Sequence, residues 1–137
     1  MTSATTTPGS RRTDVTRWRP IVADLGFWAV AGAVVAALNG RLGDWWNVPR
    51  SALLVAGLAF LAGGVVLMFG LNRIRPTSAG LLLSFGVSNL VLAPTLWVVA
   101  SLGELPLTAA GNWALAGAGD VAVLLGIWQL TALRRRD

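Results

Sequence analysis

Four long apolar segments constrain this chain more than any other feature of its sequence. A helix needs about 20 apolar residues to cross a bilayer core of roughly 30 Å. The segments that meet this requirement comprise residues 21–38, 51–71, 78–102 and 112–133. Because a membrane span must satisfy its own backbone hydrogen bonds, the pattern predicts an all-α fold, a transmembrane four-helix bundle.

The composition agrees with a lipid environment. Of the 137 residues, 55% are hydrophobic and only 12% are charged, whereas a soluble domain of this size needs more polar surface to cover its core. We expect a polar, disordered arm over residues 1–19, a single transmembrane domain over 20–134 and a short tail over 135–137.

Cys and His are absent, which removes disulfides, imidazole bases and the usual zinc sites. No metal and no cofactor is therefore predicted.

The distribution of arginines predicts the orientation in the membrane. Arg41 and Arg50 flank the connector between the first two spans, and all other arginines lie in the arm, in the connector between the second and third spans, or in the tail. These are Arg11, Arg12, Arg17, Arg19, Arg73, Arg75, Arg134, Arg135 and Arg136. The positive-inside rule then places both termini in the cytoplasm. Attraction to anionic inner-leaflet lipids accounts for the net charge of +5 without a nucleic acid partner.

The connector NGRLGDWWNVPRS, residues 39–51, is predicted to be an outer hairpin loop. Asn39 and Gly40 are typical of a helix C-terminus, and Pro49 suits the start of the next helix. The connector therefore joins two antiparallel spans.

Tryptophans mark the outer interface in this arrangement. Indole rings favour the headgroup zone, where the ring is dry and the N–H is wet. Trp45 and Trp46 are expected to anchor the connector there, and Trp97 and Trp113 fall near the same level. An alternative makes Trp45 and Trp46 the lid of a lateral pocket for a lipophilic small molecule.

Small residues recur at helical spacing on three of the spans. Since apolar burial does not drive helix association in lipid, close backbone approach and hydrogen bonds must do so. The predicted packing stripes are Gly80, Ser84 and Ser88 on the third span, Ala114, Ala118, Ala122 and Gly126 on the fourth, and Ala29, Ala33 and Ala37 beside Gly32 and Ala36 on the first. Pro94 is expected to kink the third span.

Asp120 is the first functional candidate, because an ionisable residue deep within a span is costly. It lies fourteen residues before Arg134, about 21 Å along the helix, and Asn89 lies fourteen residues after Arg75. The two should therefore stand at similar depth, and with Ser88 they form a predicted intramembrane polar cluster. Either a helix–helix hydrogen bond or a site for a proton, cation or substrate fits Asp120, which is the candidate for any catalytic role.

Asp24 and Gln129 form a second predicted pair, nearer the cytoplasm. Asp24 is five residues past Arg19, and Gln129 is five residues before Arg134, so each lies about 7.5 Å into its helix. A negative charge is favoured in a first helical turn and can pair with a snorkelling arginine. The prediction for this inner-interface pair is structural.

Several stretches support a resemblance that covers residues 21–136. They are RPIVADLG before the first span, NRIRP between the second and third, SNLVLAPTLW on the third, and IWQLTALRRR at the end. In these the chain resembles an uncharacterised family of small four-span integral membrane proteins from actinobacteria. The resemblance implies a multi-pass protein of the bacterial plasma membrane and implies no reaction.

Three functions remain open from the sequence. The favoured one is a non-enzymatic accessory or ligand-binding subunit that assembles with itself as a homodimer or with a membrane partner protein, because recognisable catalytic groups are lacking. A small transporter or channel using Asp120 is the second. The third is a membrane-embedded isomerase or cyclase that acts on a lipophilic substrate, with Asp120 as the acid or base.

Overall fold

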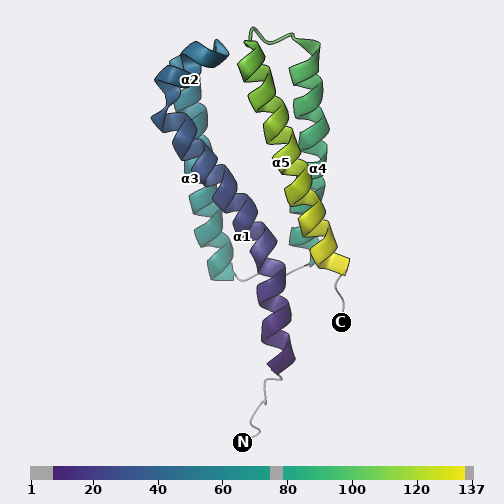
Figure 1. The fold of residues 1–137 in the computed structure, drawn as a ribbon. Coiled ribbons are helices and arrows are strands. Elements are labelled where there is room, and N and C mark those ends of the chain that lie inside the picture. Colours follow the sequence, from purple (N-terminus) through teal and green to yellow (C-terminus); the bar gives the residue numbers. More distant parts are fainter. Residues whose placement is uncertain (1–7, 75–78, 135–137) are drawn as a thin grey trace, which may run out of the picture.

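The computed structural model describes residues 8–74 and 79–134, and these are helical apart from short turns. Within these described residues, five helices follow one another (Figure 1). They are α1 (Pro8–Ala37), α2 (Asn39–Trp46), α3 (Arg50–Ile74), α4 (Ala79–Leu102) and α5 (Ala109–Arg134). The predicted all-α class is confirmed.

Four of the helices contain stretches long and apolar enough to cross a membrane. These stretches are Trp18–Ala37, Arg50–Leu71, Ala79–Leu102 and Ala109–Arg134. They coincide with the four segments predicted from the sequence to within a few residues. The chain is therefore a multi-span membrane protein by the length and composition of its helices.

The first helix begins earlier than expected. α1 starts at Pro8, so the second half of the arm predicted to be disordered is helical in the structure. Proline is well tolerated in the first helical turn, and adding a turn to an existing helix costs far less than nucleating a new one. The predictions for residues 1–7 and 135–137 lie outside the described residues.

The outer connector is mostly helical, contrary to the predicted loop. Asn39 donates a side-chain hydrogen bond to the Ala36 carbonyl at 2.6 Å, which satisfies the end of α1 while the chain continues directly into α2. α2 ends at Trp46, and its C-cap residue Asn47 adopts the left-handed conformation with φ of 56°. α3 begins one residue after Pro49, as predicted.

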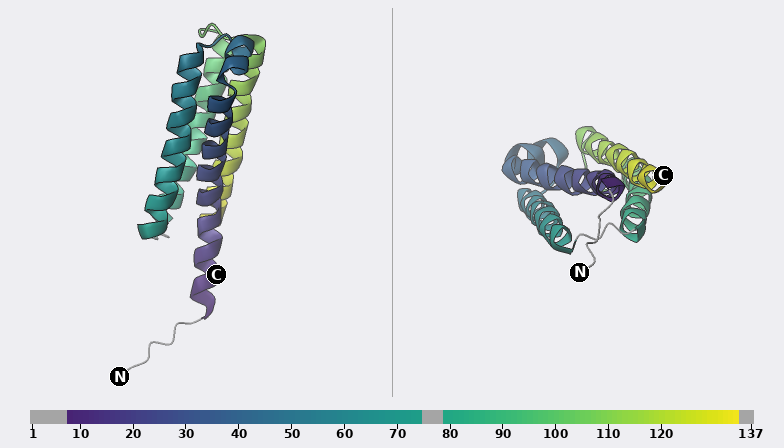
Figure 2. Two further views of the ribbon diagram at one scale, coloured as in Figure 1. Left: turned by 90° about the vertical axis from the view of Figure 1, so that its left-hand side faces the viewer. Right: turned by 90° about the horizontal axis from the view of Figure 1, so that it is seen from below.

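The helices are arranged as two hairpins. α1 packs along α3 and α4 packs along α5, whereas α1 contacts α5 and α4 over shorter stretches. Among the described residues, no Cα atom of α3 lies within 8 Å of one in α4, and the right-hand view of Figure 2 shows this separation. The four long helices of the predicted bundle are thus arranged as an open pair of hairpins, with α3 and α4 apart from each other.

Glycines allow α1 and α3 to approach closely. A Cβ atom added at Gly57 would lie 2.6 Å from the carbonyl oxygen of Gly32, and one at Gly64 would lie 2.8 Å from the Cβ of Ala29. Of the predicted α1 stripe, Ala29 and Gly32 are buried, while Ala37 is exposed. The contact face is therefore rotated slightly from the one predicted.

The α4–α5 hairpin corrects the stripe predicted on α4. The buried residues of α4 are Leu82, Gly86, Asn89 and Ala93, whereas the predicted residues Gly80, Ser84 and Ser88 are exposed. The predicted stripe therefore lies on a different face of α4. Residues four apart share a face, but adjacent residues such as Ser88 and Asn89 are rotated by about 100° from each other. On α5, Ala122 and Gly126 are buried as predicted, and α4 continues as a helix through Pro94.

Candidate functional site

Three polar side chains from three helices meet inside the protein. Asp24 of α1, Asn89 of α4 and Gln129 of α5 are 2%, 6% and 0% exposed. The Nδ2 group of Asn89 and the Nε2 group of Gln129 each donate to Oδ2 of Asp24 at 2.7 Å. Asn89 Nδ2 also lies 3.1 Å from Oε1 of Gln129. We call these three residues the polar node.

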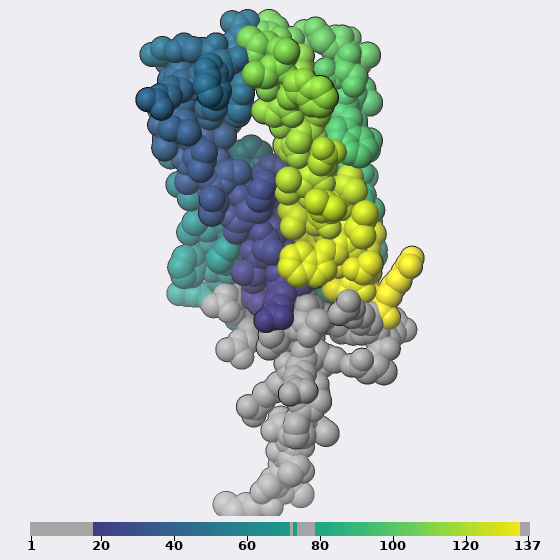
Figure 3. Space-filling model, in the orientation of Figure 1, coloured from purple at the N-terminus to yellow at the C-terminus, as the bar shows by residue number. Residues whose placement is uncertain are grey.

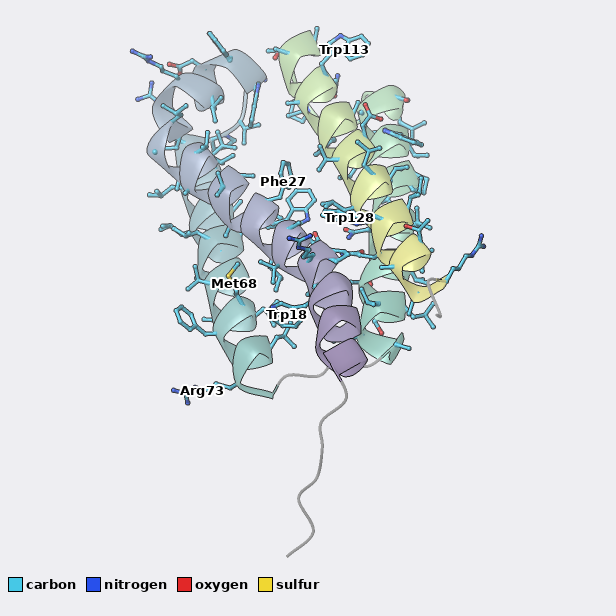
Figure 4. The ribbon with its side chains drawn as sticks, turned by 60° about the horizontal axis from the view of Figure 1, so that its bottom comes forward. Trp18, Phe27, Met68, Arg73, Trp113 and Trp128 are labelled. Atoms are coloured by element: carbon cyan, nitrogen blue, oxygen red, sulfur yellow. The ribbon has the colours of Figure 1, made fainter. Side chains whose placement is uncertain are left out.

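An apolar cluster surrounds one side of the node. Its buried members are Ile21, Leu25, Leu82 and Ala132, and Met68 and Phe85 are among the partly buried residues packed against it. Figure 4 shows this region between α1 and the α4–α5 hairpin, with Phe27 and Trp128 nearby. Because hydrogen bonds in a low-dielectric environment are costly to lose, the node resists separation of the two hairpins.

One oxygen of the node lacks a partner. Within the described residues, the buried Oδ1 atom of Asp24 accepts no hydrogen bond. A buried polar atom is normally bonded to protein or ordered water, and a carboxylate oxygen can accept from water or bind a proton or small cation. The node therefore combines hydrogen bonds that link three helices with one buried acceptor, Asp24 Oδ1, that has no partner among the described residues.

The node differs in membership from the predicted cluster. The structure brings Asp24 and Gln129 together, and it adds Asn89, which was expected beside Asp120. Asp120 and Ser88 are both exposed. Counting residues from the flanking arginines gives a depth along a helix but not the face on which a side chain lies.

The α4–α5 register explains why Asn89 and Asp120 stay apart. A Cβ atom at Gly119 would lie 3.1 Å from the Ala93 carbonyl oxygen, so Asp120 is level with Ala93, about one helical turn from Asn89. Gly119 faces α4, and the next residue is rotated about 100° away from that contact. The roles predicted for Asp120 and Ser88 stay predictions.

A second set of polar contacts fastens the hairpins at the α2 end. The Thr108 backbone N–H donates to the Trp46 carbonyl at 3.2 Å, and the Thr108 hydroxyl donates to the Trp45 carbonyl. Asn47 Nδ2 donates to the Pro106 carbonyl at 2.6 Å. We call these contacts the α2 clamp, and Figure 3 shows a hollow below it between the upper parts of α1 and α5.

Sequence reasoning missed Asn47 and Thr108, although a signal for one of them was present. Thr108 directly precedes α5, and its hydroxyl accepts from the Gly111 N–H at 3.2 Å, as an N-cap does. A threonine four residues before the predicted start of the span is a weak but readable sign of this cap. Nothing in the sequence indicated that the same hydroxyl would also bond to α2.

The predicted interfacial tryptophans occupy different environments. Trp45 is 69% exposed and Trp113 is 78% exposed, and Figure 4 places Trp113 at the end of α5 near α2. Trp46 is half-buried, and Trp97 donates its indole N–H to the Ala116 carbonyl at 3.2 Å. Trp45 and Trp113 are therefore the two rings most available to headgroups.

Comparison with known proteins identifies no relative. No family model, no curated protein and no solved structure matches this chain. The resemblance to the actinobacterial four-span family therefore stays a prediction, and the function must be argued from the geometry.

Proposed function

We propose that this chain is a small non-enzymatic membrane protein, an accessory or assembly subunit in which the polar node holds two helical hairpins together. The observation that carries the proposal is the burial of Asp24, Asn89 and Gln129, each at most 6% exposed, with their hydrogen bonds directed at one another. Groups that act on a substrate must be accessible to it, whereas groups that join helices need only reach each other. The node fits the second role.

The uncovered helix faces support an assembly role. α3 buries one stripe against α1, while Val55, Val66 and Phe69 on its other faces are each more than 60% exposed. The separation of α3 from α4 leaves further apolar surface uncovered. In a bilayer such surface is covered by lipid or by helices of another membrane protein.

We place both termini on the cytoplasmic side of a bacterial plasma membrane. The start of α1 and the end of α5 lie at the same end of the molecule (Figure 1), and the exposed Arg19, Arg73 and Arg134 belong to helix segments at that end. The positive-inside rule and attraction to anionic inner-leaflet lipids support this orientation.

A second candidate function is the transport of protons or a small cation. The observation that favours it is the unpartnered Oδ1 of Asp24, since intramembrane carboxylates often mark ion pathways. Two other hypotheses gain less support. They are transport through Asp120 and an isomerase or cyclase that uses Asp120 as its acid or base. Both need groups gathered around Asp120, and that residue lies on an exposed face of α5.

Purified protein in sealed liposomes distinguishes the two candidates. The assembly proposal predicts that a pH-sensitive dye and a sodium-sensitive dye report the same leak as in protein-free vesicles. Flux above that leak, lost in Asp24→Asn with the helical content unchanged, would overturn the proposal in favour of transport.

The assembly role itself is tested in the native membrane. We expect removal of the protein to lower the recovery of one defined membrane complex on native gels, and Asp24→Asn to lower it partly. An unchanged set of membrane complexes after removal would count against an accessory role.

A further inference from the structure

The outward face of α5 carries a regular stripe with an acid at its centre. Its members, Trp113, Gly117, Asp120, Leu124, Ile127 and Thr131, are spaced alternately four and three residues apart. This spacing, 3.5 residues on average, keeps one side of a helix facing a neighbouring helix over many turns. We call these residues the α5 seam.

The seam lies opposite the buried side of α5. Gly119, Ala122, Gly126 and Gln129 are buried, whereas Leu124 is 68% exposed and Asp120 is also exposed. Gly117 has no atom within 4 Å of the position that a Cβ would occupy. The described residues of one copy therefore leave the seam uncovered, and Gly117 is open to close approach by another helix.

Asp120 needs a hydrogen-bonding partner that the described part of one copy does not supply. It lies eleven residues after Ala109 and fourteen before Arg134, about 16 Å and 21 Å along the helix from these ends. That places it near the middle of the hydrocarbon, where an exposed carboxyl group is unfavourable. Among the described residues, no hydrogen bond or ion pair reaches it, and the arginines of the sequence lie outside the span interiors.

We infer that the α5 seam is the contact surface for a second copy of this chain, with the two Asp120 carboxyl groups hydrogen-bonded across a twofold axis. Where the twofold axis runs along the membrane normal between two parallel α5 helices, each seam residue lies near the same residue of the other copy. A protonated carboxyl group is both a donor and an acceptor, so Asp120 is complementary to itself. Lipid tails offer it no such partner.

The remaining seam residues fit this pairing. Gly117, one turn from Asp120, lets the two helices approach closely, as small residues do in membrane dimers. Leu124 and Ile127 supply apolar contacts on the other side of the acid. This inference concerns a surface distinct from the polar node and does not rest on the proposed function.

Cysteine cross-linking tests the contact directly, because the chain has no cysteine of its own. Leu124→Cys lies on the seam, and Val66→Cys on α3 is a matched control, since the two parent residues are 68% and 67% exposed and lie at similar distances from the α2 ends of their helices. Mild oxidation in liposomes should convert most of the Leu124→Cys protein to a disulfide dimer and little of the Val66→Cys protein. Equal cross-linking of the two variants would overturn the inference.

Energy transfer between labelled copies at decreasing protein-to-lipid ratios measures the strength of the association. Asp120→Leu should weaken dimerisation at least tenfold, whereas Asp120→Asn should retain most of it, because two amides also pair with each other. Since Asp120 is exposed, both variants should keep the helical content of the natural protein. A monomeric natural protein at high protein-to-lipid ratio, or full dimerisation of Asp120→Leu, would exclude this contact.

Discussion

Asn89 Nδ2 and Asp24 Oδ2 lie 2.7 Å apart although 65 residues separate them in the chain. This bond and the one from Gln129 are the direct side-chain links that the node makes between α1 and the α4–α5 hairpin. Because Asp24 is 2% exposed, removing either donor leaves its buried Oδ2 atom with one hydrogen bond in place of two.

We therefore expect Gln129→Leu to destabilise the protein by about 1–3 kcal/mol, the usual cost of removing one hydrogen-bond partner from a buried polar group. Reversible unfolding in mixed detergent micelles measures the change. Thr95→Val, on an exposed face of α4, removes a hydroxyl that donates within its own helix to the Val91 carbonyl, and it should change stability by less than about 0.5 kcal/mol. Similar values for the two variants would show that the node is not a fastening point.

Gly57 should not tolerate a side chain. A Cβ atom there would lie 2.6 Å from both the Ala36 nitrogen and the Gly32 carbonyl oxygen, and these are backbone atoms of α1 that can move only if α1 and α3 separate. Gly57→Ala is expected to cost about 1–3 kcal/mol, as overpacking does. The same unfolding experiment provides the measurement.

Gly63 on the same helix is the matched control for Gly57. Nothing lies within 4 Å of its Cβ position, and alanine favours a helix over glycine by roughly 1 kcal/mol. Gly63→Ala should therefore leave stability unchanged or raise it slightly. Equal destabilisation by the two substitutions would contradict the α1–α3 contact described above.

Thr108→Val should loosen the α2 clamp. The change removes the hydroxyl that donates to the Trp45 carbonyl and accepts from the Gly111 N–H, and loss of such a helix cap costs about 1 kcal/mol. Spin labels at Asp44 and Trp113 should report a broader distance distribution in the variant than in the natural protein. An unchanged distribution would show that α2 is held by other contacts.

The orientation can be measured by labelling from one side. Glu104 lies in the connector between α4 and α5 and is exposed, and Arg134 is exposed at the opposite end of α5. A membrane-impermeant maleimide should label Glu104→Cys in intact spheroplasts and label Arg134→Cys only after permeabilisation. The reverse pattern would invert the proposed topology.

A lipid environment and four candidate spans could both be predicted from the amino-acid sequence. Both follow from the lengths of the apolar segments, because the thickness of the bilayer sets how many residues a helix needs to cross it. The sequence also placed Asp24 and Gln129 at a similar depth, since each lies five residues from a flanking arginine, whereas the hydrogen bond between them is seen in the structure.

Which polar groups meet and which face outward could not be predicted without the packing of the helices. Residue counting placed Asn89 beside Asp120. In the structure, Asn89 lies on the buried face of α4 and donates to Asp24, whereas Asp120 lies on an exposed face of α5. The separation of α3 from α4 and the bonds of Thr108 to α2 were equally absent from local patterns. Depth in a membrane is a property of one helix, whereas rotation and crossing depend on the backbone contacts between helices at residues such as Gly32 and Gly57.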